Sequence, residues 1–538
     1  MLKKYYTVLP HLLLAVAAAA ASAILDGYVT IRMMKLLDYA LSHDMQLMKQ
    51  EAPVLILLAV CMIPVGILAA MAGNYYKRKA NESMKKYYIR SVFGKNIAEF
   101  QKENNAAYLS AMTNDFDTLE NNLVTGVYSV CSGAVQFLTG FWILSTVDFR
   151  MLLLGAAIVI VNIVISMVTS KKTNRAYKER SDMFDGFTSH IKEILSAFHI
   201  VKNYNLQDRV TQDYHSKSDA IQQKGFQIEK ILTYVISIQH FFISGSLYGI
   251  ICGIGYLAVL GKVTPGGLLL VVQGIQRMMW PLFNISENLP KLFTTGDLIR
   301  KLEKTLENAD THEENIALTK FGKEIELKDV GFSYDKEEEL ILNEINLKLK
   351  KNGKYLIVGP SGGGKSTLLK LLRKYYQPTA GRIFIDGHEL REVKRDAYYK
   401  LIANVEQQVF LFEDTVKNNI TLYKEYSDQE LEDALEASGL NDFIRNLPEG
   451  LNSMIYDSGK NISGGERSRI VIARALLNKA SILLMDEAFA SLDMERAREI
   501  EKTILGLKDI TVINVSHVIF QDTRELYDRV ITVKRRIH

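Results

Sequence analysis

Six apolar runs in the first part of this 538-residue chain constrain its fold more than any other feature. A helix of roughly 20 apolar residues spans the hydrocarbon core of a bilayer. We therefore predict six transmembrane helices, at about residues 9–30, 52–72, 124–147, 151–170, 231–260 and 266–289. The overall composition, 48% hydrophobic with a net charge of +4, conceals this arrangement because the rest of the chain has the pattern of a soluble α/β protein.

Basic residues orient the predicted spans. The two long connections, 73–123 and 171–230, are rich in Lys and Arg, whereas the two short turns carry one basic residue each, Arg150 and Lys262. By the positive-inside rule, the N-terminus, both long connections and the C-terminal half are expected in the cytoplasm. We expect an integral protein of a bacterial plasma membrane.

The long connections are themselves predicted to be helical. Both have an amphipathic period and lack proline, which favours extensions of the spans into the cytoplasm. We place their turns near residues 112–115 and 196–199. The three cysteines lie inside apolar runs without C-x-x-C spacing, so neither a disulfide framework nor a zinc site is expected.

The sixth predicted span carries a polar stripe on one helical face. Its members are Gln273, Gln276, Arg277, Trp280, Asn284 and Glu287. A charged residue at mid-membrane costs about 2.5–3.5 kcal/mol on insertion scales, so Arg277 is not expected to face lipid. We favour a water-filled substrate pathway lined by Gln273, Gln276, Arg277 and Trp280. The alternative is a packed polar seam in which Arg277 pairs with a carboxylate such as Asp26.

A phosphate-binding loop organises the C-terminal half. It fits G-x-x-x-x-G-K-[ST] and follows an apolar strand at residues 355–358. Its residues are Gly359, Pro360, Ser361, Gly362, Gly363, Gly364, Lys365, Ser366 and Thr367. The glycines let backbone N–H groups surround phosphate oxygens, and Lys365 adds a positive charge at the β- and γ-phosphates. Ser366 is predicted to offer its hydroxyl to Mg²⁺, so ATP and Mg²⁺ are the expected ligands.

Two adjacent acids end a second apolar run, which is predicted to be a buried strand. Asp486 and Glu487 follow residues 481–485. At the carboxyl end of a strand, Asp486 would hold Mg²⁺ through water and Glu487 would orient or deprotonate the attacking water.

Between these motifs, residues 461–469 include Ser463, Gly464, Gly465 and Glu466. This stretch resembles the signature motif of the ABC transporter family, usually written L-S-G-G-Q, with Ile462 in place of Leu and Glu466 in place of Gln. The resemblance implies that these residues, at a helix N-terminus, contact the γ-phosphate of an ATP held by the opposite nucleotide domain. It therefore implies a dimer, either with a second copy or with a homologous half-transporter.

The same resemblance implies further site residues. Tyr334 would stack on adenine, and Gln407, rather than Gln408, would sense Mg²⁺ and contact the membrane half. Asp493 would belong to a loop that crosses the dimer interface. His517, which follows an apolar strand, would act as the switch histidine near the γ-phosphate.

The resemblance covers essentially the whole chain. It implies a membrane α-helical domain of the exporter type, followed by a cytoplasmic α/β P-loop NTPase domain with the family's α-helical subdomain. The predicted boundaries are 1–305 for the transmembrane domain, 306–322 for a linker and 323–538 for the nucleotide-binding domain. An edge strand is predicted at 325–330, where the second half begins.

The predicted function is ATP-driven export of a peptide, lipid or amphipathic small molecule by alternating access. One alternative is an importer of a metal chelate on the same fold. Another is a regulatory family member that binds ATP without pumping, which usually has a damaged acid or switch histidine. Glu487 and His517 are both present here. The sequence does not identify the substrate.

Overall fold

The chain folds into two compact units. The computed structural model describes residues 5–146, 175–176, 179–180, 183–184, 186–261, 263–308, 312–334, 340–517 and 519–534. The first unit comprises Met1–Lys95 and Glu103–Glu307, and the second comprises Asn96–Lys102 and Asn308–His538. The short helix α4 (Ile97–Gln101) therefore groups with the second unit, although both flanking segments belong to the first.

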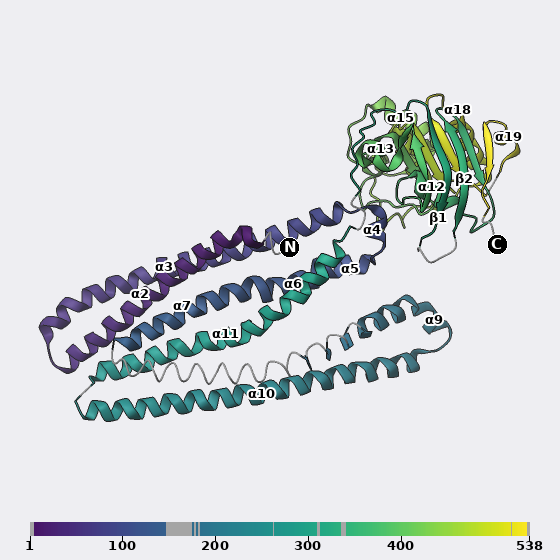
Figure 1. The fold of residues 1–538 in the computed structure, drawn as a ribbon. Helices are drawn as coiled ribbons and strands as arrows, with labels where there is room; N and C mark the ends of the chain where they lie inside the picture. Colours follow the sequence, from purple (N-terminus) through teal and green to yellow (C-terminus); the bar gives the residue numbers. More distant parts are fainter. Residues whose placement is uncertain are drawn as a thin grey trace. The chain divides into compact units, whose positions relative to one another are not determined.

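Long helices make up the first unit, and several of them run alongside one another (Figure 1). They are η1 (Tyr6–Val8), α2 (Leu9–Leu41), α3 (Met45–Phe93), α5 (Asn105–Ser110), the π-helical turn η2 (Ala111–Asp115), α6 (Phe116–Leu119), the π-helical turn η3 (Glu120–Thr125), α7 (Gly126–Ser145), α9 (Phe198–Asn203), α10 (Gln207–Val259) and α11 (Pro265–Thr305). Helix α2 packs against α3, α7 and α11, and α11 also packs against α7 and α10. Residues 186–196 are helical as well.

Three described helices are long and apolar enough to cross a membrane, over Tyr6–Leu41, Met45–Phe93 and Ala107–Ser145. They contain the first two predicted spans and residues 124–145 of the third. The fourth prediction, residues 151–170, lies outside the described residues. The fifth and sixth predicted spans fall almost entirely within α10 and α11, respectively.

One of the two predicted cytoplasmic turns is wrong. Residues 112–115 lie in η2, within a continuous helical stretch, and the hydroxyl of Thr113 donates to the carbonyl of Leu109, one helical turn earlier. The chain turns instead on either side of α4, where Asn96 adopts an extended backbone after Gly94 ends α3. The second turn is confirmed by a break at Ala197, and another follows at residues 204–206.

Specific local residues start and join the long helices. The side chain of Asp44 accepts hydrogen bonds from two backbone N–H groups at the start of α3. Thr264 caps α11 in the same way and also donates to Asp38 of α2 over 2.7 Å. Asp38 accepts a second bond, also of 2.7 Å, from the backbone of Gly266, so the end of α2 is tied to the start of α11.

Two β-sheets form the core of the second unit, one antiparallel and one parallel. Their orders are β2-β1-β4-β5 and β6-β7-β8-β3-β9. The strands are β1 (Glu324–Phe332), β2 (Leu342–Lys350), β3 (Lys354–Val358), β4 (Ala380–Ile385), β5 (His388–Glu389), β6 (Ile402–Val405), β7 (Ile482–Asp486), β8 (Thr511–Val515) and β9 (Arg529–Thr532). Strand β3, which precedes the phosphate loop, is paired on both sides with parallel neighbours.

The expected edge position of the 325–330 strand is wrong, because β1 lies between β2 and β4. Ile325 and Leu327 are buried on one face, whereas Glu326 points outward and pairs with Lys348. Such alternation shows that one face of the sheet is solvated, and it does not distinguish an edge strand from a central one.

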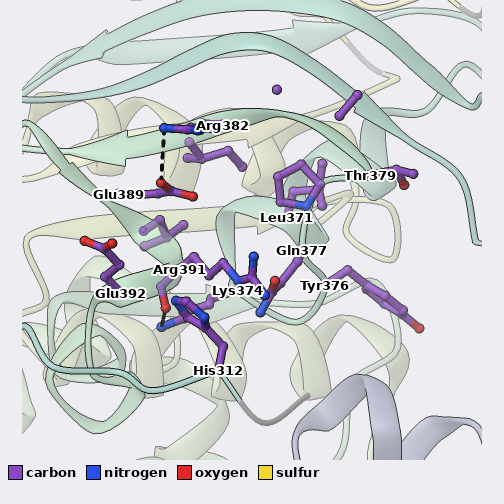
Figure 2. A pocket seen from close by; sticks show the side chains of 15 residues that line it. His312, Leu371, Lys374, Tyr376, Gln377, Thr379, Arg382, Glu389, Arg391 and Glu392 are labelled. Carbon is purple, nitrogen blue, oxygen red and sulfur yellow. Dashed lines mark hydrogen bonds and ion pairs between the residues drawn. The ribbon is translucent and has the colours of Figure 1, made fainter. Parts of the chain in front are cut away.

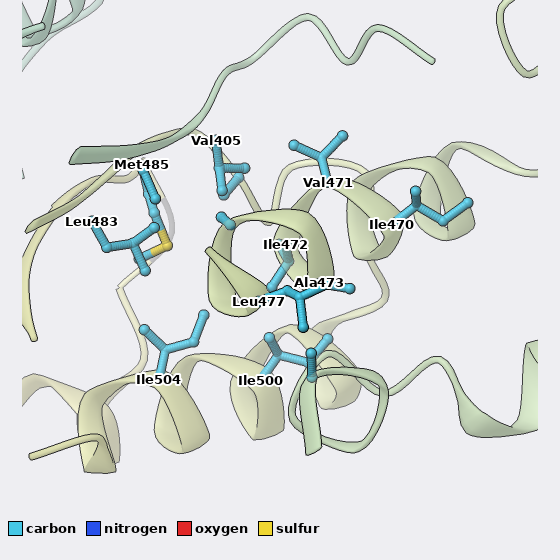
Figure 3. Packing of buried hydrophobic residues seen from close by; sticks show 14 of the residues in the cluster. Val405, Ile470, Val471, Ile472, Ala473, Leu477, Leu483, Met485, Ile500 and Ile504 are labelled. Carbon is cyan, nitrogen blue, oxygen red and sulfur yellow. The ribbon is translucent and has the colours of Figure 1, made fainter. Parts of the chain in front are cut away.

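The second unit also contains helices. They are α12 (Lys365–Leu372), η4 (Leu390–Glu392), α13 (Arg395–Leu401), α14 (Val416–Thr421), α15 (Asp428–Ala437), α16 (Asn441–Asn446), η5 (Gly450–Asn452), α17 (Gly464–Leu477), α18 (Met494–Gly506) and α19 (Gln521–Arg524). Apolar side chains from α17, α18 and β7 interlock in one buried cluster, including Ile472, Met485 and Ile504 (Figure 3). This packing holds the signature-bearing helix against the strand that ends in the two acids.

Candidate functional site

The phosphate loop has the backbone that its glycines predict. Gly359, Gly362 and Gly364 all have positive φ, at 154°, 73° and 95°. A Cβ at Gly359 would overlap the carbonyl oxygen of Val533, so only glycine fits the strand-to-loop turn. Lys365 begins α12 with 5% of its surface exposed, and its ammonium donates to the carbonyls of Gly359 and Pro360 over 3.0 and 2.9 Å.

Ser366 and Asp486 meet beside this loop. The hydroxyl of Ser366 donates to Oδ1 of Asp486 over 3.1 Å, although the two residues are 120 positions apart. Burial raises the pKa of Asp486 above its ordinary value, and the charge of Arg373 and the bond from Ser366 act in the opposite direction. Mg²⁺ favours hydroxyl, carboxylate and phosphate oxygens and commonly uses one or two carboxylates, so this pair fits the expected ion.

Glu487 lies between two other predicted residues. The amide Nε2 of Gln407 donates to its Oε2 over 2.8 Å, and Nε2 of His517 lies 3.1 Å from its Oε1. The Glu487 side chain is 18% exposed, and its backbone has a φ of 50°, which is unusual for a residue with a side chain. Of the two adjacent glutamines, Gln407 is the one whose hydrogen bond to Glu487 the structure shows.

Tyr334 lies against the helix that follows the phosphate loop. Its hydroxyl is 3.3 Å from that of Thr367, and its ring packs edge-on against Phe332 and Tyr376. Lys370 was not predicted from the sequence as a site residue, yet its ammonium lies 5.3 Å from the centre of the Tyr334 ring and donates to its hydroxyl over 3.2 Å. Helical spacing is the signal that was available, because Lys370 lies one turn beyond Ser366 and Thr367 on α12.

The signature residues form a reciprocal cap on α17. The backbone N–H of Ser463 donates to Oε2 of Glu466 over 2.7 Å, and the N–H of Glu466 donates to the Ser463 hydroxyl over 3.3 Å. This is a capping box, which occupies the Glu466 carboxylate at the helix N-terminus. A Cβ on Gly464 or Gly465 would meet Ser491, in the loop that leads to Asp493.

Asp493 caps the next helix, α18, by accepting a 3.0 Å bond from the backbone of Arg496. Among the residues that the structure describes, no hydrogen bond or ion pair joins Ser463 or Glu466 to the phosphate loop of the same chain. The structure therefore brings Lys365, Asp486 and Glu487 into one neighbourhood and leaves the signature residues with separate partners.

In the membrane unit, the residues of the polar stripe differ in how exposed they are. Gln273, Gln276 and Trp280 are exposed on α11. Arg277 is partly buried; it forms an ion pair with Asp26 of α2 and donates to the Thr30 hydroxyl over 2.8 Å. The pairing raised as an alternative from the sequence is therefore present.

A pocket of about 390 Å³ lies elsewhere in the C-terminal unit (Figure 2). Its lining includes Lys374, Tyr376, Arg382 and Glu389, and an ion pair of 3.8 Å joins Arg382 to Glu389 across it. None of the predicted nucleotide-binding residues is among its lining residues, so the pocket is distinct from the phosphate loop.

Comparison with known proteins now decides the family. Residues 11–282, just over half of the chain, match the model of the ABC transporter transmembrane region, and residues 342–490 match a second model, described as ABC transporter. The chain belongs to the ABC transporter family. It is an ATPase-coupled membrane transporter, as the combination of phosphate loop, paired acids and signature motif predicts.

Two curated ABC relatives cover most of this chain. One, from Pectobacterium atrosepticum, is named an ATP-dependent lipid A-core flippase and is 28% identical over 87% of this chain and 81% of its own length. Another of the same name, from Syntrophus aciditrophicus, is 26% identical over 89% of this chain and 80% of its own. A solved bacterial Atm1-family ABC exporter with ATP bound aligns with a TM-score of 0.82 at 20% identity, covering 98% of this chain and 93% of the other, so this ABC transporter has the same fold.

Proposed function

We propose that this ABC transporter is an exporter that works as a dimer and moves an amphipathic, lipid-like molecule out of the cytoplasm. The observation that carries the proposal is the intact hydrolytic arrangement at Glu487, contacted from both sides by Gln407 and His517. A family member that binds ATP without pumping has no need of this arrangement.

Hydrolysis is proposed to begin with water activated by Glu487. Its Oε1 and Oε2 are oriented by two different side chains, so the carboxylate is held in one rotamer and accepts the water proton without reorganisation. The N–H at Nε2 of His517, shared between Glu487 and the γ-phosphate, would stabilise the γ-phosphate as the bond to the leaving diphosphate breaks. Ser366, Asp486 and Gln407 are the residues that would hold Mg²⁺, which when bound would supply positive charge to neutralise the phosphates.

ATP is proposed to lie along the phosphate loop with adenine against Tyr334. Lys365 would exchange its two loop carbonyls for phosphate oxygens, which are stronger acceptors. Because the signature residues of one chain have no polar contact with its own phosphate loop among the described residues, we assign them to the nucleotide of a partner subunit. Ser463, Gly464, Gly465 and Glu466, together with Asp493, would then complete the partner's site.

Export is supported by the relatives named lipid A-core flippases. The basic connections set only the orientation, because they are predicted to face the cytoplasm. Both termini would then be cytoplasmic. The proposed pathway is lined by Gln273, Gln276 and Trp280 on α11, with Arg277 beside it. Gln side chains are costly in contact with lipid tails, so their exposure on this helix favours a wet cavity between subunits.

The direct test is lipid transport in proteoliposomes. The purified chain is reconstituted with a fluorescently labelled phospholipid, and ATP is added outside so that only outward-facing nucleotide domains work. We expect ATP-dependent movement of label away from the leaflet that faces these domains. Movement toward that leaflet would indicate an importer, and ATP hydrolysis without lipid movement for any lipid headgroup would refute the proposed substrate class.

A further inference from the structure

The turn that follows α12, the helix that begins at Lys365, contacts the segment that carries Gln407. The buried guanidinium of Arg373 is 3% exposed and donates through Nη2 to the carbonyl of Val405 over 3.3 Å. Its Nη1 lies 3.6 Å from Oε1 of Glu406. Arg373 therefore contacts both residues that precede Gln407, the backbone of Val405 and the side chain of Glu406.

A tyrosine two residues further on holds the same carboxylate oxygen. The hydroxyl of Tyr375 donates to Oε1 of Glu406 over 2.9 Å. The Arg373 guanidinium also lies over the Tyr375 ring, 6.0 Å from its centre. Burial, followed by the nearby Glu406 charge, raises the pKa of Tyr375, so this hydroxyl remains a donor throughout the physiological range.

Glu406 itself is the exposed member of this group, with 46% of its side chain accessible. The hydrophobic core does not need a carboxylate at this position, and the ordinary expectation for an exposed Glu is a solvated side chain. Instead, its Oε1 accepts a hydrogen bond from the Tyr375 hydroxyl and forms an ion pair with Arg373. The next residue, Gln407, then donates to Glu487 over 2.8 Å.

We propose that Tyr375, Arg373 and Glu406 are positioning residues that hold Gln407 in reach of Glu487, so that the phosphate-loop helix sets the orientation of the catalytic base. This inference rests on the proposed role of Glu487. We call these three residues the brace. Helix α12 carries Lys365 at its start and is followed directly by the brace, so it links occupation of the phosphate loop to the geometry of the water-activating carboxylate. Gln407 is exposed and lies after the end of β6, so without the brace its side chain would sample several rotamers.

The test is ATP hydrolysis by the full chain in detergent or nanodiscs, with Mg²⁺ varied. Variants Tyr375→Phe and Glu406→Ala are each expected to lower kcat about tenfold and to raise the Mg²⁺ concentration for half-maximal hydrolysis, because a small misplacement of a catalytic group is costly. Binding of a fluorescent ATP analogue without Mg²⁺ should be unchanged in both. Glu406→Gln should recover most of the rate, because an amide oxygen still accepts from Tyr375.

Two comparisons make the result specific. The double variant Tyr375→Phe/Glu406→Ala should be no slower than Glu406→Ala alone if Tyr375 acts through Glu406. Glu432→Gln is the matched control, since Glu432 is exposed on α15 and has no ion pair with any residue in the described part of the chain; it should behave as the wild type.

Wild-type rates in Tyr375→Phe and Glu406→Ala, with Glu487→Gln inactive, would overturn the brace and leave the proposed function standing. Normal hydrolysis in Glu487→Gln would instead refute the proposed function. If the two fold-decreases in kcat multiply in the double variant, or if nucleotide binding without Mg²⁺ is weaker, the substitutions damage the domain generally. Either result would also overturn the inference.

Discussion

Gln407 and Glu487 lie 80 residues apart in the sequence, and the amide of the first donates a 2.8 Å hydrogen bond to the carboxylate of the second. The bond joins the segment after β6 to the residue after β7, two neighbouring parallel strands. It uses the carboxylate oxygen that His517 does not contact. The proposed base is therefore oriented from both sides.

Glu487→Gln is expected to retain ATP binding and to lower kcat by about 10²–10⁴-fold, because a general base contributes on that scale. The measurement pairs phosphate release by the purified chain with binding of a fluorescent ATP analogue. The Gln side chain keeps the size of Glu and one acceptor oxygen, so the thermal unfolding midpoint should change little. Near-normal hydrolysis would remove Glu487 from the role of base.

The signature cap predicts how Glu466 tolerates substitution. Glu466→Ala removes the acceptor of the Ser463 N–H and should lower the free energy of unfolding by about 1 kcal/mol, as loss of a helix cap does. Glu466→Gln keeps an acceptor oxygen and should lose less. Thermal unfolding of the three proteins checks this order, and equal stabilities would show that the cap contributes nothing.

The ion pair between Arg277 and Asp26 predicts a non-additive pair of substitutions. Arg277→Ala or Asp26→Ala alone leaves an unpartnered charge in a membrane helix, which is costly. The double variant removes both charges and should be more stable than either single variant. Thermal stability in detergent gives the order directly. If the double variant is instead the least stable of the three, the ion pair contributes little to stability.

Lipid-stimulated ATPase activity of the same variants separates the two roles considered for Arg277. Loss of stimulation in the stable double variant would assign Arg277 to the substrate pathway. Unchanged stimulation would assign it to packing between α2 and α11. Gln276→Ala tests the pathway itself and should reduce stimulation, because Gln276 is one of its exposed lining residues on the same helix.

Glu430 predicts a pH dependence of stability. It accepts a 2.6 Å bond from Lys479 and closes a capping box with Ser427, and these partners lower its pKa from 4.5 to about 2. A carboxyl with a depressed folded-state pKa stabilises the fold fully above its unfolded pKa and loses that contribution as pH falls toward the folded value. The stability difference between wild type and Glu430→Gln should therefore be constant above about pH 5 and should shrink between 4.5 and 2.

Chemical unfolding at stepped pH measures this difference. A gap that stays constant down to the acid limit would contradict the prediction. Lys479→Met provides the partner control, since it removes the first cause of the lowered pKa and should shift the window toward ordinary Glu values.

Much of the site could be predicted because its motifs are local. The glycines at 359, 362 and 364 are required by the positive φ of a single loop, and Asp486 ends a strand that is apolar in the sequence. The cytoplasmic turn predicted at 112–115 was misplaced because local polarity alone does not decide where a long helix ends. Polar residues at 113–115 suggested a turn, but the helix continues there as a π-helical turn, and the Thr113 hydroxyl donates to the Leu109 carbonyl within the helix.

By itself the sequence determined the apolar spans, the phosphate loop, the paired acids and the signature, because each depends on residues within a few turns or one strand. Only the tertiary structure decided which side chains meet. Gln407 rather than Gln408 reaches Glu487, Arg277 finds Asp26 251 residues away, and Glu406 joins the phosphate-loop helix to the segment before Gln407. Strand order and helix packing bring these residues together, and no local pattern in the chain encodes that juxtaposition.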